Sequence, residues 1–271
     1  MSEIISFHLS KFTYDKDDLI RIYDPTAGSG SLLIRVAEKF QKHMNELHHD
    51  IRIKYIAQEI LPTSFKTLSM NLIMHNIPPQ LINIREADTL EDDWPTESNG
   101  DKKVKAIVAN PPYSHLWKPD NKINDPRFQS YGLAPKSKAD YAFLLHSLYH
   151  LDKDGIMAIV LPHGVLFRGG SEYEIRKSLI KKQKIDTIIG LPNNMFMGTG
   201  ISTIIMILKE NKTTDDIMFV DGSKLFQKME IKINLIDHIL SKYQTLLITE
   251  LKKMDFQELF RLKKLRKMTT I

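Results

Sequence analysis

The chain has 271 residues, enough for one large domain or two small ones, and its 42% hydrophobic and 26% charged residues exclude wholesale disorder. It contains no cysteine, which excludes disulfides, cysteine-ligated zinc, iron–sulfur clusters and thiol nucleophiles. There are 38 Lys and Arg residues against 33 Asp and Glu residues, a formal net charge of +5. Taken alone, this charge suggests a polyanionic partner such as nucleic acid.

The charge excess is confined to the end of the chain. Residues 228–271 hold ten basic and five acidic residues, so residues 1–227 are balanced and the net charge is no evidence that they bind nucleic acid. The same segment contains no Gly, Pro, Ala or Val. We therefore divide the chain into a core, residues 1–227, and an atypical basic tail, residues 228–271.

The tail has two interpretations. Leu259, Leu262 and Leu265 have helical spacing and predict an amphipathic helix. Alternatively, the tail is translated out of frame, because residues 260–271, back-translated and read in a shifted frame, give a sequence similar to that of the family named below.

Short β-rich apolar runs alternate with helical patterns along the core. The runs predict strands at residues 19–24, 53–58, 81–85, 104–109, 155–161, 185–191 and 203–208, with a further candidate at 218–221. Helical spacing predicts helices at residues 31–42, 63–75, 141–151 and 171–182. This alternation indicates an α/β fold with a parallel sheet and helices on both faces, in which ligands bind beyond the carboxyl ends of the strands.

Neither a signal peptide nor a membrane span is expected. Residues 1–10 have no basic region followed by a long apolar run. The longest uncharged stretch, residues 187–208, is interrupted by Pro192, Asn193, Asn194, Gly198 and Gly200, which break it into strand, loop and strand. We expect a cytoplasmic protein.

The first predicted strand ends in a glycine turn, which consists of Asp24, Pro25, Thr26, Ala27, Gly28, Ser29 and Gly30. Two glycines allow a ligand to approach the backbone, and the following helix offers free N–H groups. The third glycine of a dinucleotide fingerprint and the lysine of a P-loop are both missing. From this turn alone, ligand binding and a purely packing role are equally supported.

Acidic residues follow the next two predicted strands. Glu59 stands where a carboxylate can accept hydrogen bonds from the two hydroxyls of a ribose. Asp88 could accept from the exocyclic amine of an adenine. Either acid alone is more typical of a solvated loop, but together with the glycine turn they outline a nucleoside site.

The most specific motif is Asn110, Pro111, Pro112 and Tyr113, at the end of the fourth predicted strand. Two prolines end the strand and stiffen the backbone. The Asn110 side-chain oxygen and the Pro111 carbonyl can then accept both hydrogens of one amino group and favour a pyramidal, nucleophilic nitrogen. Tyr113 can stack on the base that carries the amine. The alternative is a stiff loop after a buried strand.

These motifs, in this order, resemble the amino-methyltransferases that use S-adenosylmethionine. The match is closest to the methylation (M) subunit of type I restriction–modification systems, which make N6-methyladenine in DNA. Residues 133–143, 161–170 and 189–201 support this narrower resemblance, which covers residues 20–226. It implies a Rossmann-like α/β fold with a mostly parallel, seven-stranded sheet.

The resemblance also implies roles for the residues. The residues of the glycine turn would hold the methionine part of S-adenosylmethionine, with Glu59 at the ribose and Asp88 at the adenine. The target adenine would leave the duplex, stack on Tyr113 and donate to Asn110 and Pro111. The implied partners are DNA and the specificity and restriction subunits of a type I complex.

The chain also departs from the family pattern. The family has an N-terminal helical domain and a Thr-Pro-containing cofactor segment upstream of the first strand, which we expect to be absent here, with weakened cofactor binding. Two rival functions follow: a catalytically inactive fragment, and a protein-glutamine N5-methyltransferase, which shares Asn-Pro-Pro-Tyr. The long loop 114–138 and residues 161–164 favour the DNA enzyme over the glutamine enzyme.

Three further features have open or negative interpretations. His163 could act as an acid or base, but a packing or capping role is favoured. Trp117 and Phe128 face either DNA or the protein core. We find no His-x-x-x-His pair combined with a carboxylate among the ten histidines, and therefore expect no metal site.

Overall fold

The computed structural model describes residues 1–15, 18–49, 51–96, 102–196, 200–224, 226–228 and 233–235. Almost all of the basic tail therefore lies outside the described residues, and both interpretations of it stay predictions. No helix among the described residues is long and apolar enough to span a membrane.

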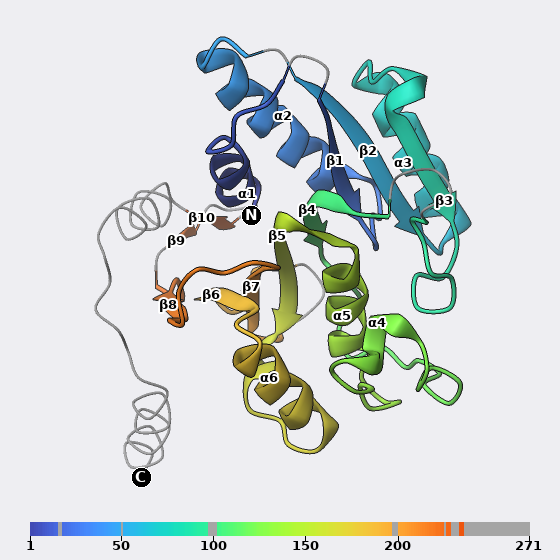
Figure 1. Cartoon of the computed structure of the whole chain (residues 1–271), viewed down its shortest axis with the longest axis vertical. Coiled ribbons are helices and arrows are strands. Elements are labelled where there is room, and N and C mark those ends of the chain that lie inside the picture. The colour runs from blue at the N-terminus through green and yellow to red at the C-terminus, as the bar shows by residue number, and fades with distance from the viewer. Residues whose placement is uncertain are drawn as a thin grey trace.

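Eight strands form one mixed sheet (Figure 1). In chain order they are β1 (Leu19–Asp24), β2 (Arg52–Glu59), β3 (Ile82–Glu86), β4 (Val104–Ala109), β5 (Leu151–Pro162), β6 (Ile185–Gly190), β7 (Thr203–Lys209) and β8 (Met218–Asp221). The strand order across the sheet is β3-β2-β1-β4-β5-β7-β6-β8. The α/β class is confirmed, but the sheet has eight strands rather than the expected seven, because β8 adds to the edge beside β6.

One strand, β7, runs against all the others. It pairs antiparallel with β5 on one side and with β6 on the other, whereas the remaining neighbours are parallel. The strand order reverses between β1 and β4, which makes the carboxyl ends of these two strands the expected ligand crevice.

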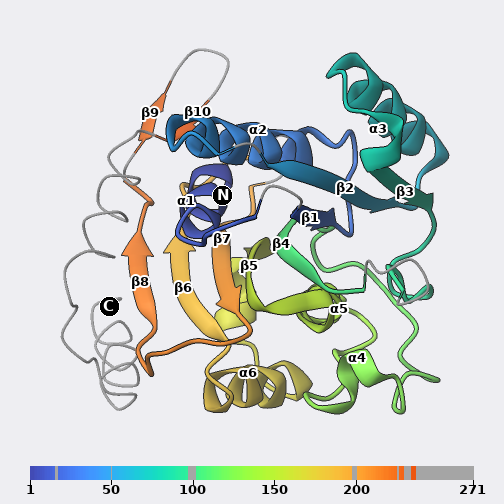
Figure 2. The same cartoon turned by 45° about the horizontal axis from the view of Figure 1, so that its top comes forward.

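Helices cover both faces of the sheet (Figure 2). They are α1 (Ser2–Leu9), α2 (Ser31–Glu46), α3 (Pro62–Met74), α4 (Pro126–Gln129), α5 (Asp140–His150) and α6 (Ser171–Lys181), with short 3-10 turns η1 (Pro79–Leu81) and η3 (His163–Leu166). A small antiparallel pair, β9 (Phe226–Lys228) and β10 (Ile233–Leu235), follows the sheet.

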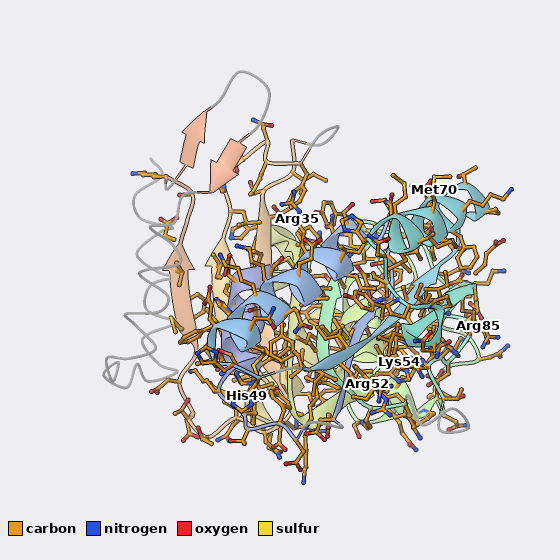
Figure 3. All side chains as sticks on the ribbon, turned by 90° about the horizontal axis from the view of Figure 1, so that it is seen from above. Arg35, His49, Arg52, Lys54, Met70 and Arg85 are labelled. Carbon is orange, nitrogen blue, oxygen red and sulfur yellow. The ribbon has the colours of Figure 1, made fainter. Side chains whose placement is uncertain are left out.

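The core consists of two apolar layers separated by the sheet. Along β5, Ile156, Ala158 and Val160 belong to the layer under α1, α2 and α3, while alternate residues belong to the layer that includes α5 and α6. This alternation follows from the two-residue period of a strand. On α2 the opposite, outer face is polar, and the exposed Arg35 lies on it (Figure 3).

The helix α1 was not predicted. Its eight residues are too short to show a clear period, and it is stabilised by burial of Ile4, Ile5 and Leu9 in the layer that it shares with α2.

Candidate active site

The glycine turn lies at the carboxyl end of β1 and leads directly into α2. Gly28 and Gly30 have φ angles of 56° and 77°, a left-handed conformation that side chains with a Cβ rarely adopt. A Cβ on Gly30 would lie 2.4 Å from Leu68 Cδ1, so this glycine is also required by packing against α3. A Cβ on Gly28 would meet nothing within 4 Å, so the space beside it is open.

Glu59 ties the end of β2 to this turn. Its Oε2 accepts a hydrogen bond from the Gly28 amide at 2.8 Å, and its Oε1 accepts from the Leu61 amide at 2.9 Å. The side chain is 7% exposed. Each carboxylate oxygen retains a second lone pair, so Glu59 can hold the turn and still accept from a ligand hydroxyl.

Asp88 lies beyond β3, where its Oδ1 accepts from the Leu90 amide at 2.9 Å. The neighbouring Thr89 donates its hydroxyl hydrogen to the Pro25 carbonyl, which joins the Asp88 turn to the glycine turn. The three carboxylates predicted for a nucleoside site, Asp24, Glu59 and Asp88, therefore lie on connected turns at the ends of β1, β2 and β3.

Asp24 is enclosed by protein. It is 2% exposed, and its Oδ1 accepts from the Thr26 amide at 3.0 Å. Burial, and secondarily the charge of Glu59, raises the pKa of Asp24 to about 7, while the Thr26 amide opposes the shift. A cationic ligand at this turn would favour the ionised form of the carboxyl.

The residues of the turn fit a nucleoside cofactor with a cationic end. The buried hydroxyl oxygen of Thr26 has no hydrogen-bond partner among the described residues, which is uncommon for a buried polar group. The same turn contains the open space beside Gly28 and leads into the N-terminus of α2. These features support the predicted site.

The Asn-Pro-Pro-Tyr segment leaves the carboxyl end of β4, next to the glycine turn. The register Tyr23–Ile107 aligns β1 with β4, and adjacent strands are about 4.8 Å apart. Asn110 is exposed, Pro111 is buried, and the half-buried Tyr113 donates its hydroxyl hydrogen to Asn110 Oδ1 at 2.8 Å. Burial raises the pKa of Tyr113 to about 12, so the phenol stays a donor at neutral pH.

Phe196 contacts the Asn-Pro-Pro-Tyr segment, although no motif in the sequence singles it out. It lies in the segment between β6 and β7, and its ring meets that of Tyr113 edge-on, with centroids 6.3 Å apart and an interplanar angle of 72°. The two residues are brought together because β7 begins at the edge where β4 ends. The only indication of this contact in the sequence is that Phe196 lies within residues 189–201, which support the family resemblance.

The loop aromatics turn inward. Trp117 is 5% exposed and Phe128 is fully buried, and their rings contact each other edge-on at 5.3 Å. The core-packing interpretation is therefore confirmed for both. The ring of His163 packs against Phe167 at 5.5 Å, in agreement with the favoured packing role.

A pair of histidines forms a cluster with a carboxylate. His146 and His150 do have His-x-x-x-His spacing, and the carboxylate of Asp93 completes a cluster whose donor atoms all lie within 4.8 Å of one another. His150 Nε2 is 3.0 Å from Asp93 Oδ1, and His146 lies between the Tyr23 hydroxyl, at 2.9 Å, and Arg127 Nη1, at 3.0 Å.

Arg127 gives this cluster a structural role. Its guanidinium lies 3.7 Å from Asp93 and also donates to the carbonyls of Thr89 and Leu90, at 2.9 and 3.2 Å. The arginine, which pairs most closely with Asp125 at 2.6 Å, thus joins the cluster to the Asp88 turn. The expectation that no His-x-x-x-His pair combines with a carboxylate is therefore wrong. The geometry is that of a hydrogen-bond network in which both histidines are buried and Asp93 is exposed.

A doubly wound sheet with a glycine turn after β1, acids after β2 and β3, and Asn-Pro-Pro-Tyr after β4 is the arrangement expected of an amino-methyltransferase. The sequence profile of the N-6 DNA Methylase family matches residues 2–267. The chain therefore belongs to this family.

Individual relatives within this family are methylase subunits of type I restriction enzymes. The chain is 42% identical over 220 residues to the type I restriction enzyme MpnII methylase subunit of Mycoplasma pneumoniae, covering 78% of this chain and 40% of that protein. It is 29% identical over 208 residues to the HindI methylase subunit of Haemophilus influenzae, covering 76% and 45%. The chain thus spans less than half the length of these two relatives.

A solved structure supports the same assignment. The type I restriction–modification methyltransferase subunit from Streptococcus thermophilus superposes with a TM-score of 0.81 at 38% identity, covering 94% of this chain and 53% of that one. The resemblance to methylation subunits of type I systems is confirmed.

Proposed function

We propose that this chain is the methyl-transferring core of a type I restriction–modification methylation subunit, which methylates the N6 amino group of adenine in DNA. One observation carries the proposal: Asn110 and Tyr113 follow β4 directly beside the glycine turn of β1, with Phe196 against Tyr113. An acceptor for an amine, a stacking surface for a base and a nucleoside-binding turn thereby share one edge of the sheet.

S-adenosylmethionine, when bound, supplies the methyl group. In the proposed reaction a bond forms between adenine N6 and the methyl carbon, the bond between that carbon and sulfur breaks, and one proton leaves N6 for solvent. Asn110 Oδ1 and the Pro111 carbonyl accept the two N6 hydrogens and hold the lone pair toward the methyl group. Tyr113 and Phe196 would flank the adenine after it leaves the duplex.

Cofactor contacts are assigned to the three turns. Residues 24–30 would hold the cationic methionine end. Within this turn, the Thr26 hydroxyl would be one of the groups available for hydrogen bonds. Glu59 would accept from the ribose and Asp88 from the adenine amine. Positioning and electrostatics do most of the work in this scheme, and no general base is assigned.

The names of the relatives describe methylase subunits of type I restriction enzymes. We accordingly propose that the chain acts on DNA as part of a complex with a specificity subunit and a restriction subunit, in the cytoplasm. The specificity subunit would supply sequence recognition, in keeping with the neutral charge of residues 1–227.

The test is transfer of a radiolabelled methyl group from S-adenosylmethionine to DNA, with the chain assembled with its matching specificity subunit. We expect label in N6-methyladenine, and loss of that label with Asn110→Ala. Label in release-factor protein instead of DNA would favour glutamine methylation. If calorimetry detects no cofactor binding at millimolar concentration, the chain is an inactive fragment.

A further inference from the structure

The residue that follows the catalytic motif has an unusual backbone conformation. Ser114 has a φ of 50°, in the left-handed region that is rare for residues other than glycine. Such a conformation persists only where surrounding contacts hold it. The holding contact here is a hydrogen bond from the Ser114 amide to Asp140 Oδ1, at 2.8 Å.

Asp140 is the first residue of α5 and is fully buried. Its second oxygen accepts from Arg168 Nη1 at 2.8 Å, so both carboxylate oxygens are occupied. Arg168 also donates to Glu172 Oε1 at 3.2 Å, and the Glu172 side chain is itself nearly buried. Two carboxylates therefore share one guanidinium, but only Asp140 contacts the catalytic segment.

The surrounding backbone is shaped to hold the guanidinium. A Cβ on Gly164 would lie 2.6–2.8 Å from the Nε, Nη2 and Cζ atoms of Arg168, so the guanidinium occupies the space that any other residue would need. Arg176 donates to the Arg168 carbonyl at 3.1 Å and to the Val165 carbonyl at 2.8 Å, which fixes the segment that carries Arg168.

A second contact supports the same segment. The amide of Ala139, next to Asp140, donates to the carbonyl of His115 at 2.8 Å, one residue beyond Ser114. The chain leaving Tyr113 is thus anchored at two successive residues by the start of α5. Anchoring at this point restricts the orientation of the Tyr113 ring.

We infer that Asp140 and Arg168 are positioning residues for amino-group methylation. They hold Ser114 in its left-handed conformation and thereby orient Tyr113 and Asn110 toward the target adenine. This inference rests on the proposed function for its chemistry. Its geometric part predicts the orientation of the Tyr113 ring, which can be tested without any reaction.

The decisive comparison is Asp140→Asn against Glu172→Gln. Each variant removes one carboxylate from Arg168, but only the first does so at the side chain that accepts from Ser114. The amide introduced by Asp140→Asn has one oxygen in place of two, so its NH2 group must face either the Ser114 amide or the Arg168 guanidinium. We expect Asp140→Asn to lower kcat for DNA methylation about 100-fold, because small misplacements of reacting groups have effects of that order. Glu172→Gln should stay within about threefold, and cofactor Kd, measured by calorimetry, should be unchanged in both.

Gly164→Ala provides an independent route to the same effect. The added methyl group displaces the Arg168 guanidinium without touching Ser114 or Tyr113, and kcat should fall in the same direction as in Asp140→Asn. Melting temperatures of all variants identify any that fail to fold.

A spectroscopic measurement does not depend on activity. With 3-fluorotyrosine incorporated and the Tyr113 resonance assigned from Tyr113→Phe, we expect its fluorine signal to shift or broaden in Asp140→Asn and to stay in place in Glu172→Gln. Equal spectra in the two variants, or equal losses of kcat, would overturn the inference. An inactive wild-type complex with the expected spectra would instead count against the proposed function alone.

Discussion

The hydroxyl of Tyr113 donates a hydrogen bond to the side-chain oxygen of Asn110 across 2.8 Å. This contact sets the direction of the Asn110 oxygen before any substrate arrives. An amide oxygen has two lone pairs, so it can keep the Tyr113 hydrogen and accept a hydrogen from the target amine.

The contact gives distinct expectations for three variants. Tyr113→Phe keeps the stacking ring and loses only the orienting hydrogen bond, so methyl transfer should fall about three- to tenfold. Tyr113→Ala removes the stacking surface and should lower the methyl-transfer rate about 100-fold. Asn110→Ala removes the acceptor and should lower this rate about 100- to 1000-fold. Single-turnover rates on DNA provide the measurement. A Tyr113→Phe loss as large as that of Tyr113→Ala would contradict the assignment.

The two glycines of the β1 turn should respond differently to alanine. Gly30→Ala adds a methyl group 2.4 Å from the buried Leu68 and should lower the free energy of unfolding by about 2–4 kcal/mol. Gly28→Ala meets open space and should cost only about 1 kcal/mol of backbone strain.

Cofactor affinity should reverse this order. The space beside Gly28 is where the cofactor would lie, so Gly28→Ala should weaken cofactor binding more than Gly30→Ala does. Urea denaturation and calorimetry together separate the two effects. Equal losses of affinity in both variants would place the cofactor elsewhere.

Asp24 should make the cofactor-free protein less stable at neutral pH than in mild acid. The pKa of this carboxyl is raised from 3.8 to about 7 in the fold, so its contribution is fully present below pH 3.8 and is lost as the pH rises through about 7. Asp24→Asn keeps an acceptor for the Thr26 amide and removes this loss. The variant should therefore gain stability relative to wild type between pH 4 and 8, by a few kcal/mol at about 1.4 kcal/mol per unit. A constant difference across this range would contradict the raised pKa.

Binding of a cationic cofactor at this turn should release protons near pH 7. The ligand's positive charge favours the ionised carboxyl of Asp24 and lowers its pKa. Calorimetric titrations in two buffers with different ionisation enthalpies should give different heats for wild type and equal heats for Asp24→Asn. Buffer-independent heats for wild type would show that the cofactor's charge lies away from Asp24.

The buried His146 should produce acid sensitivity of the opposite sign. Burial, with the charges of His150 and Arg127, holds the pKa of His146 well below 6.5, so its contribution to stability is present above pH 6.5 and is lost as the pH falls. His146→Gln should cost about 1–3 kcal/mol at pH 7, because partners in the network lose their hydrogen bonds. Its unfolding free energy should fall less steeply than that of wild type below pH 6.5, and identical slopes would remove His146 as the cause.

Much of the sheet and of the candidate site could be predicted from local patterns. Strands such as β1 and β4 are apolar runs that are followed closely by glycine or proline. The polar residues at the ends of these strands are not needed to form the sheet, and they therefore indicate a binding or catalytic role. Asp24 and Asn110 could therefore be placed on one edge from the sequence alone. The direction of β7 could not, because an apolar run reads the same in parallel and antiparallel strands.

The supporting contacts depend on pairs far apart in the chain. Asp93 and His150 are separated by 57 residues, and Ser114 and Asp140 by 26, so no local pattern links them. Asp140 lies within the family-like segment 133–143, but a buried carboxylate cannot be distinguished from a surface one without its partners. The spacing of His146 and His150 is visible in the sequence, but their carboxylate partner Asp93 is not.

The reversed direction of β7 has an evolutionary consequence. Because β7 runs antiparallel to β6, the end of β6 and the start of β7 lie at the same edge of the sheet. There the Leu191 amide donates to the Thr203 carbonyl at 3.0 Å, and the His163 amide donates to the Ser202 carbonyl at 2.8 Å. Closing a longer loop costs little additional entropy. Insertions here would reshape the wall beside Phe196 and leave the β1 turn untouched. The surroundings of Tyr113 can thus diverge within such proteins while the β1 turn stays constant.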